Sequence, residues 1–76
     1  MDSDALEAGD TVLIDFEYAG DRLQGEATII SRERGGLGHA SRIEVEVGSE
    51  RRTLNHRQFT VAVARARRAR GERRRR

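Results

Sequence analysis

Arginine side chains near the C-terminal end of the chain have the type and spacing best suited to a chemical task. Residues 65–76 contain eight arginines and one acid, Glu72, which gives this segment a net charge of +7. A guanidinium group forms paired hydrogen bonds with phosphate oxygens and stacks on nucleic-acid bases. The segment therefore predicts binding to a polyanion through phosphate contacts. The candidate contacts are Arg65, Arg67, Arg68, Arg70, Arg73, Arg74, Arg75 and Arg76.

Other interpretations of residues 65–76, which we call the arginine tail, stay open. The tail could be a solvated charge run without fixed structure, or it could fold back on the acidic residues near the N-terminus. Alanine and arginine both favour helices, so residues 63–70 could also become helical on a partner. Gly71 would then end that helix.

A second basic cluster consists of Arg51, Arg52 and Arg57, which flank a short predicted strand and the turn after it. These side chains could share a face with the start of the arginine tail and add phosphate contacts. They could equally form ordinary cross-strand ion pairs with Glu44 or Glu46. The sequence leaves both interpretations open.

No residue pattern indicates catalysis or metal binding. Cysteine is absent, and two histidines, His39 and His56, are too few for a zinc site. The glycines between Gly35 and Gly38 lack the lysine and Ser/Thr of a P-loop, so we expect a flexible hairpin loop there. The surface is expected to carry the acidic side chains Asp15, Glu17, Glu44 and Glu46. We therefore predict a protein that is not an enzyme and needs no cofactor, metal or small-molecule substrate.

The charge of the chain changes steeply along its length. The 76 residues have a net charge of +2, but residues 1–21 carry −7, residues 22–50 carry −1 and residues 51–76 carry +10. Such asymmetry predicts a nucleic acid or another acidic surface as the partner of the basic end. All 15 basic residues are arginine. RNA binding is one explanation for the missing lysine, but a GC-rich genome, which favours arginine codons, accounts for most of it.

Length and hydropathy predict one small cytoplasmic domain. The apolar runs are too short to cross a membrane, and the acidic residues at 1–4 are unlike a signal peptide. A chain of this length can bury only a modest core. We expect an acidic N-terminal segment at 1–8, a β-barrel at 9–64 and the arginine tail at 65–76.

Alternation of apolar and polar residues predicts four strands before the arginine tail, at 11–18, about 23–32, 41–47 and 51–54. Gly25 is expected to mark a bulge or a sharp bend, and the adjacent Ile29 and Ile30 indicate a bend in the strand. Residues 55–58 are expected to form one helical turn, and a fifth strand follows at 60–64. The predicted core consists of Val12, Ile14, Phe16, Ile29, Ile43, Val45, Phe59, Val61 and Val63.

Five short strands with a one-turn link before the last resemble the small SH3-like barrel of KOW, Tudor and related ribosomal or chromatin modules. The resemblance covers residues 9–64 and rests on the start at 9–12, the Gly48 and Ser49 turn, and the link at 55–59. It implies an all-β fold, a five-stranded SH3-like barrel with a basic tail. The Tudor aromatic cage does not carry over, because the chain has only three aromatic residues. An Sm-like or OB-like barrel is the nearest alternative, and the lysine-poor composition is similar to that of haloarchaeal proteins.

We expect a non-catalytic nucleic-acid-binding module, with RNA favoured over DNA and the ribosome as a candidate setting. The barrel would position the arginine tail, whose side chains would contact phosphates with little base specificity. The alternative is a structural or adaptor protein in a virion or multiprotein assembly. In that case the acidic barrel face would contact one protein and the arginine tail another.

Overall fold

Strand β1 (Thr11–Tyr18) has the bounds that its alternating sequence predicts. The computed structural model describes residues 5–38 and 40–74, with side chains described as far as Gly71. A two-residue turn joins β1 to β2 (Asp21–Glu33). The two residues of this turn, Ala19 and Gly20, have positive φ angles of 52° and 83°. Positive φ at both central positions is what a type I′ turn requires, and this turn matches the twist of a hairpin.

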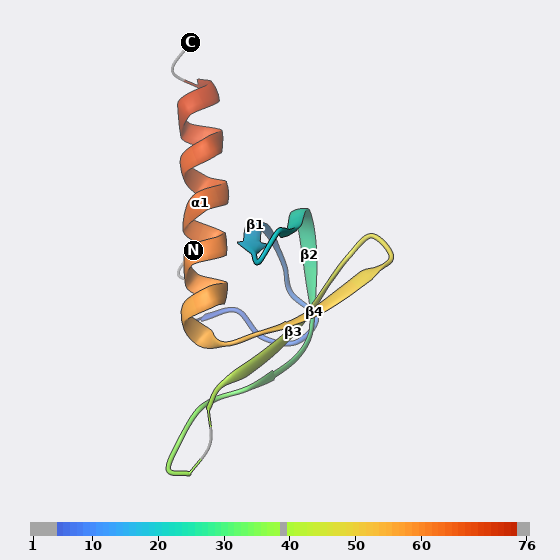
Figure 1. Ribbon diagram of the computed structural model, residues 1–76, viewed down its shortest axis with the longest axis vertical. Helices are drawn as coiled ribbons and strands as arrows, with labels where there is room; N and C mark the ends of the chain where they lie inside the picture. Colours follow the sequence, from blue (N-terminus) through green and yellow to red (C-terminus); the bar gives the residue numbers. More distant parts are fainter. Residues whose placement is uncertain (1–4, 39, 75–76) are drawn as a thin grey trace.

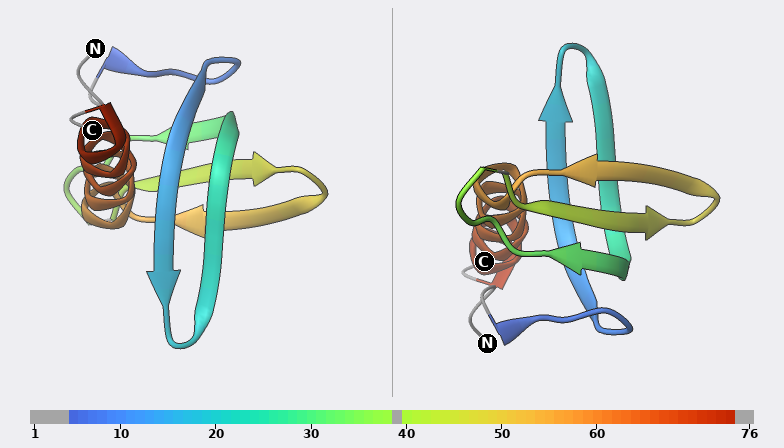
Figure 2. Two further views of the ribbon diagram at one scale, coloured as in Figure 1. Left: turned by 90° about the horizontal axis from the view of Figure 1, so that it is seen from above. Right: turned by 90° about the horizontal axis from the view of Figure 1, so that it is seen from below.

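Strand β2 is long enough to pair with two neighbours. Its first part is antiparallel to β1, and its second part is antiparallel to β3 (Arg42–Val47), which pairs in turn with β4 (Glu50–Leu54). The register shifts between Ile29 and Ser31, which confirms the bend expected at the adjacent isoleucines. Gly25, where we expected a bulge, pairs regularly with Ile14. In Figure 2 the β1–β2 hairpin consequently crosses over β3 and β4.

After β4 the chain forms one long helix, α1 (His56–Arg74), so the prediction of a fifth strand at 60–64 is wrong. The predicted helical turn at 55–58 is the start of this helix, and Gly71 lies inside it instead of ending it. The alternation of valine and alanine at 61–64 predicted a strand, but the apolar residues from Phe59 to Ala66 also fit the period of a helix. Four side chains at the spacing i, i + 3, i + 4 and i + 7 form the buried face of α1. They are Phe59, Ala62, Val63 and Ala66.

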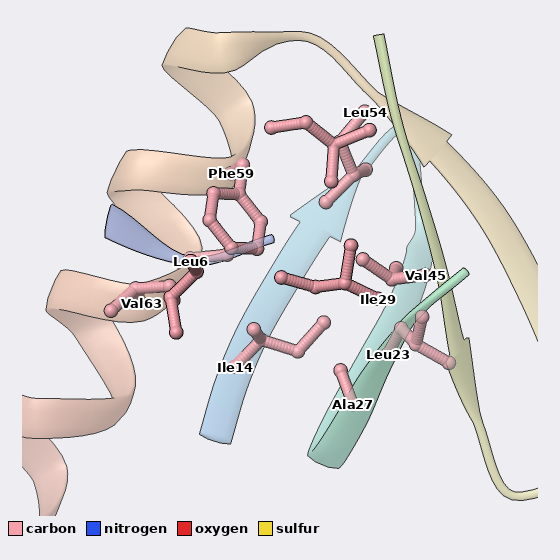
Figure 3. Close-up of a cluster of buried hydrophobic side chains, with 11 residues drawn as sticks. Leu6, Ile14, Leu23, Ala27, Ile29, Val45, Leu54, Phe59 and Val63 are labelled. Atoms are coloured by element: carbon pink, nitrogen blue, oxygen red, sulfur yellow. The ribbon is translucent and has the colours of Figure 1, made fainter. Parts of the chain in front are cut away.

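Helix α1 stands beside the sheet and packs mainly against β1 (Figure 1). Figure 3 shows Phe59 and Val63 facing Ile14 and Ile29 of the sheet. Val61, which we expected in the core, is 49% exposed because it lies on the other side of the helix. The buried apolar cluster consists of Leu6, Ile14, Leu23, Ala27, Ile29, Ile43, Val45, Leu54, Phe59, Ala62 and Val63, with Val12 and Phe16 packed at its margin.

The N-terminal segment is attached to this core. Leu6 is 1% exposed, and its carbonyl accepts a hydrogen bond from Nη1 of Arg32 (2.7 Å). The same guanidinium lies over the ring of Phe59, 5.6 Å from its centroid. Arg34 forms an ion pair with Glu7 (2.7 Å). Residues 5–8 of the predicted acidic segment therefore belong to the fold, whereas residues 1–4 lie outside the described residues.

The fold is thus mostly β: four antiparallel strands in one open sheet, in the order β1-β2-β3-β4, followed by a C-terminal helix. No closing strand is found between residues 40 and 74, because that part of the chain forms β3, β4 and α1. The helix runs through Ala64 and Arg65 without a break. The predicted division between barrel and tail at this point is therefore not an element boundary.

Candidate nucleic-acid interface

Side-chain caps fix the start of α1. Oδ1 of Asn55 accepts a hydrogen bond from the backbone N–H of Gln58 (2.7 Å), and Oε1 of Gln58 accepts one from the N–H of Asn55 (2.9 Å). Oγ of Ser41 accepts a hydrogen bond from the N–H of His56 (2.8 Å). These acceptors use N–H groups that could otherwise bind an anion. The arginine side chains, and not this capped end, are therefore the candidate phosphate contacts of α1.

The second half of α1 carries arginines away from the sheet. Ala66 is the last buried residue among the described side chains of α1, which end at Gly71, whereas Arg67, Arg68 and Arg70 are exposed. Figure 1 shows this half of the helix rising beyond the strands. Arg68 and Arg70 form no ion pair within the described part of the chain. Their charge is accordingly displayed to solvent on a rigid helix.

The other arginines of the tail are placed differently. Arg65 is only half-buried and lies 3.7 Å from the carboxylate of Glu17, at the limit of an ion pair. Arg73 and Arg74 belong to the last turn of α1, but their side chains are not described, and Arg75 and Arg76 lie outside the described residues. The tail is thus helical at least to Arg74.

Arg51 and Arg52 of the second cluster form ion pairs within the sheet. Arg51 contacts Glu46 across the β3–β4 pair (3.1 Å) and approaches Glu44 (3.9 Å). Arg52 contacts Asp21 (2.7 Å) and Glu50 (2.9 Å). Hydrogen bonds from Arg52 hold the pKa of the Asp21 carboxyl below its usual value of 3.8. A nucleic acid that used these two arginines would have to compete with these carboxylates.

Arg57, the third member of that cluster, has a different environment. It is exposed on the first turn of α1 and forms no ion pair among the residues that the structure describes. It lines a groove of about 240 Å³ between the end of β1 and the start of α1, which we call the β1–α1 groove. The same groove is also lined by Asp15, Phe16, Glu17, Tyr18, Val61 and Arg65.

The prediction that Asp15 lies on the acidic surface is wrong, because this residue is only 7% exposed. Its Oδ2 lies 3.4 Å from Nη2 of Arg22 across the β1–β2 hairpin. Its Oδ1 is buried and has no hydrogen-bond partner. Strand alternation places this side chain on the face of β1 opposite Ile14, so the local sequence carried no signal of its burial. Asp15 lines the β1–α1 groove together with residues of α1.

The remaining sequence candidates lie at the β2–β3 loop and at the start of α1, where Gly35 and His56 line one pocket with Arg32, Arg34 and Ser41. The glycines at 35–38 lie in the exposed β2–β3 loop, His56 begins α1, and His39 lies outside the described residues. Within residues 5–38 and 40–74, no group of three or more His, Cys, Asp or Glu side chains is placed to hold a metal ion. No helix in the described chain has the length and apolar character needed to span a membrane. Comparison of the chain with protein-family models, curated proteins and solved structures finds no match.

Proposed function

We propose that this protein is a non-catalytic nucleic-acid-binding module that prefers RNA and contacts phosphates through the arginines of α1. One observation carries the proposal: the arginine-rich segment is a helix that extends past the sheet, with Arg68 and Arg70 exposed and unpaired within the described residues. Neither a structureless charge run nor a tail neutralised along its whole length by the protein's own acids would present charge in this way.

A preformed helix lowers the entropy cost of binding. Side chains on a rigid helix lose their own rotamer freedom when they dock, but the backbone is already ordered. Each phosphate that an arginine neutralises releases condensed counterions from the nucleic acid, which makes the affinity steeply dependent on salt. The exposed arginines are therefore expected to provide affinity and orientation with little base specificity.

The arginine composition favours RNA, whereas groove geometry decides which part of an RNA the helix can reach. An α-helix with its side chains is about 10–12 Å across, which fits the major groove of B-DNA at about 12 Å. The major groove of A-form RNA is too narrow for side chains to read, so RNA-binding proteins favour loops, bulges and single strands. We accordingly expect α1 to bind RNA beside an unpaired segment, with duplex DNA as the main competitor. The cytoplasm, the ribosome as a setting, and the SH3-like resemblance remain hypotheses on which this proposal does not depend.

The adaptor hypothesis has less support. Its acidic face would use carboxylates such as Asp21 and Glu46, which already pair with Arg52 and Arg51 of the same chain. A protein partner would have to replace these contacts before it gained any new ones. Identifying what co-purifies with the native protein distinguishes the two hypotheses directly.

Salt-dependent binding to an RNA hairpin tests the proposal. If roughly six to eight phosphates are contacted, log affinity should fall with log salt at a slope of about −5 to −7. The double variant R68Q/R70Q should lower the magnitude of that slope by about 1 to 2. R51Q/R52Q is the matched control, because it removes the same charge from arginines that already have partners. Affinity that does not depend on salt, or no binding to any nucleic acid at low salt, would contradict the proposal.

A further inference from the structure

We propose that the β1–α1 groove is a stacking site for one unpaired nucleobase of an RNA strand, with Tyr18 as the stacking ring. Arg57 and Arg65, which also line the groove, would then contact the phosphates next to that base. This inference rests on the proposed function, because it names the RNA feature bound beside the arginines of α1. Three observations carry it: an exposed aromatic side chain, the small size of the groove, and a row of cations on one side of the helix.

The stacking surface comes from one face of β1. Phe16 and Tyr18 are two residues apart, so both lie on the same face of the strand as the buried Ile14. Phe16 packs at the margin of the core, whereas Tyr18 ends the strand and is 64% exposed. Val61 lines the groove from α1 and is 49% exposed. A base that stacks on Tyr18 would cover apolar surface that the protein itself leaves in water.

The groove has room for one ring system. Its volume is about 240 Å³. Sites for drug-sized ligands usually start at about 300 Å³, so a larger ligand would not fit. In a duplex each base is stacked between its neighbours, and its face is not open to a side chain. The expected ligand is therefore an unpaired base in a loop, a bulge or a single strand.

Cations form a row on the side of α1 that lines the groove. Arg57, Val61 and Arg65 follow one another at steps of four residues, so they lie on one side of the helix. Arg68 comes three residues later and continues the row past the groove. At the rise of an α-helix, Arg57 and Arg65 are about 12 Å apart along the axis. A strand that follows this row would place a base in the groove and a phosphate on either side of it.

The charges at the rim favour a nucleotide over a protein side chain. Arg57 forms no ion pair within the described chain, and Arg65 has only the 3.7 Å contact with Glu17. The Glu17 side chain is 51% exposed, so it can turn away when a phosphate binds Arg65. Like charges on neighbouring turns of a helix repel one another, and a phosphate beside Arg65 and Arg68 would relieve this repulsion. An apolar side chain of a protein partner would cover Tyr18 but leave these cations without an anion.

Intrinsic fluorescence reports on this groove directly, because Tyr18 is the single tyrosine of a chain without tryptophan. The probes are a short single-stranded RNA without self-complementarity, the duplex that it forms with its complement, and single-stranded DNA of the same sequence. We expect the single-stranded RNA to quench Tyr18, because a base stacks on its ring. The duplex should leave the emission nearly unchanged.

Variants of Tyr18 separate stacking from charge. Tyr18→Ala should weaken binding of the single-stranded RNA by about 10- to 100-fold, measured by anisotropy of labelled RNA, because one base loses its stacking partner. Tyr18→Phe keeps the ring and should bind within about twofold of the unaltered protein. Leu37→Ala is the matched control for loss of an exposed apolar side chain, since Leu37 lies in the β2–β3 loop. Both positions are exposed, so we expect every variant to fold, and circular dichroism checks this.

Removal of the exposed acid that lines the groove should have the opposite effect. Glu17→Gln releases Arg65 and removes a repulsive charge, so we expect it to tighten binding of the single-stranded RNA about two- to fivefold. Glu26→Gln is the matched control, because it removes the same charge from an exposed residue of β2 that does not line the groove. A gain in affinity cannot result from misfolding. Unchanged affinity after Glu17→Gln would contradict phosphate contacts at the rim.

The outcomes separate this inference from the proposed function. The stacking groove is overturned by equal affinity for single strand and duplex, by the absence of quenching, or by an effect of Tyr18→Ala no larger than that of Leu37→Ala or Tyr18→Phe. If R68Q/R70Q still lowers the salt slope, the proposed function stands without the groove. Equal affinity for single-stranded RNA and DNA, with quenching by both, supports the groove and overturns the preference for RNA. No binding of any nucleic acid at low salt overturns both.

Discussion

Asn55 and Gln58 cap each other across the first turn of α1, each side chain accepting a hydrogen bond from the other residue's backbone N–H at 2.7 and 2.9 Å. This reciprocal arrangement satisfies two N–H groups at the point where the chain leaves β4. It commits residue 56 onward to a helix, and the four buried residues of α1 then fall on one face. The pair therefore determines where the arginines are displayed.

Removal of the cap should destabilise the protein. We expect Asn55→Ala to lower the free energy of unfolding by about 0.5–2 kcal/mol, because the Gln58 N–H loses its acceptor. Asn55→Asp is the matched control and should retain most of the stability, since aspartate caps helices equally well. Urea unfolding followed by circular dichroism gives both values. Equal losses for the two variants would mean that the cap contributes nothing.

Phe59 and Val61 should respond in opposite ways to truncation to alanine. Phe59 is fully buried at the centre of the core, so Phe59→Ala should cost about 3–5 kcal/mol, which could unfold a domain of this size. Val61 is 49% exposed on the helix, and alanine is the better helix former, so Val61→Ala should change stability by less than about 0.5 kcal/mol. A large loss of stability from Val61→Ala would contradict its placement on the exposed side of α1. Thermal and urea unfolding of both variants provide the comparison.

Shortening the chain tests whether the arginine tail is part of the folded unit. A protein ending at Ala64 loses the buried Ala66 and cuts α1 shortly after Val63, so we expect it to unfold cooperatively but with about 1–2 kcal/mol less stability. A protein ending at Arg70 keeps every residue of α1 that is buried among its described side chains, and we expect it to differ from the full chain by only a few tenths of a kcal/mol. The comparison requires urea unfolding of both at one salt concentration. Identical midpoints would show that folding is independent of residues 65–70.

The ion pair between Asp21 and Arg52 should make stability depend on pH. The pKa of Asp21 is lowered in the folded protein by the hydrogen bond from Arg52, so the folded state binds this proton less readily than the unfolded chain. Its contribution is then fully present above the unfolded pKa of about 3.9 and is lost as the pH falls through the lower, folded pKa. Asp21→Asn should flatten this acidic part of the stability profile. Glu26→Gln, on an exposed residue of β2, is the matched control and should keep the slope of the unaltered protein.

Much of the sheet could be predicted from the sequence. Strand β1 was predicted at its observed bounds, and the three other strands within a residue or two, because period-two alternation directly sets which side chains face the core. Turn residues such as Gly48 are equally local signals. The arginines and their charge asymmetry are also properties of the sequence alone.

The helix and the groove depend on long-range packing. The sequence at residues 60–64 is compatible with both the strand period and the helix period. Two features favour the helix: the capping box at Asn55 starts it, and its apolar face packs against β1. Asp15 is buried as well, in a groove that it lines together with residues of α1. The sequence by itself determined the four strands and the concentration of positive charge at the C-terminal end. The capping box at Asn55 and Gln58 is a local signal for the start of α1. Tertiary packing decided that the helix continues through residues 60–64, because its apolar face packs on β1, which is distant in the sequence.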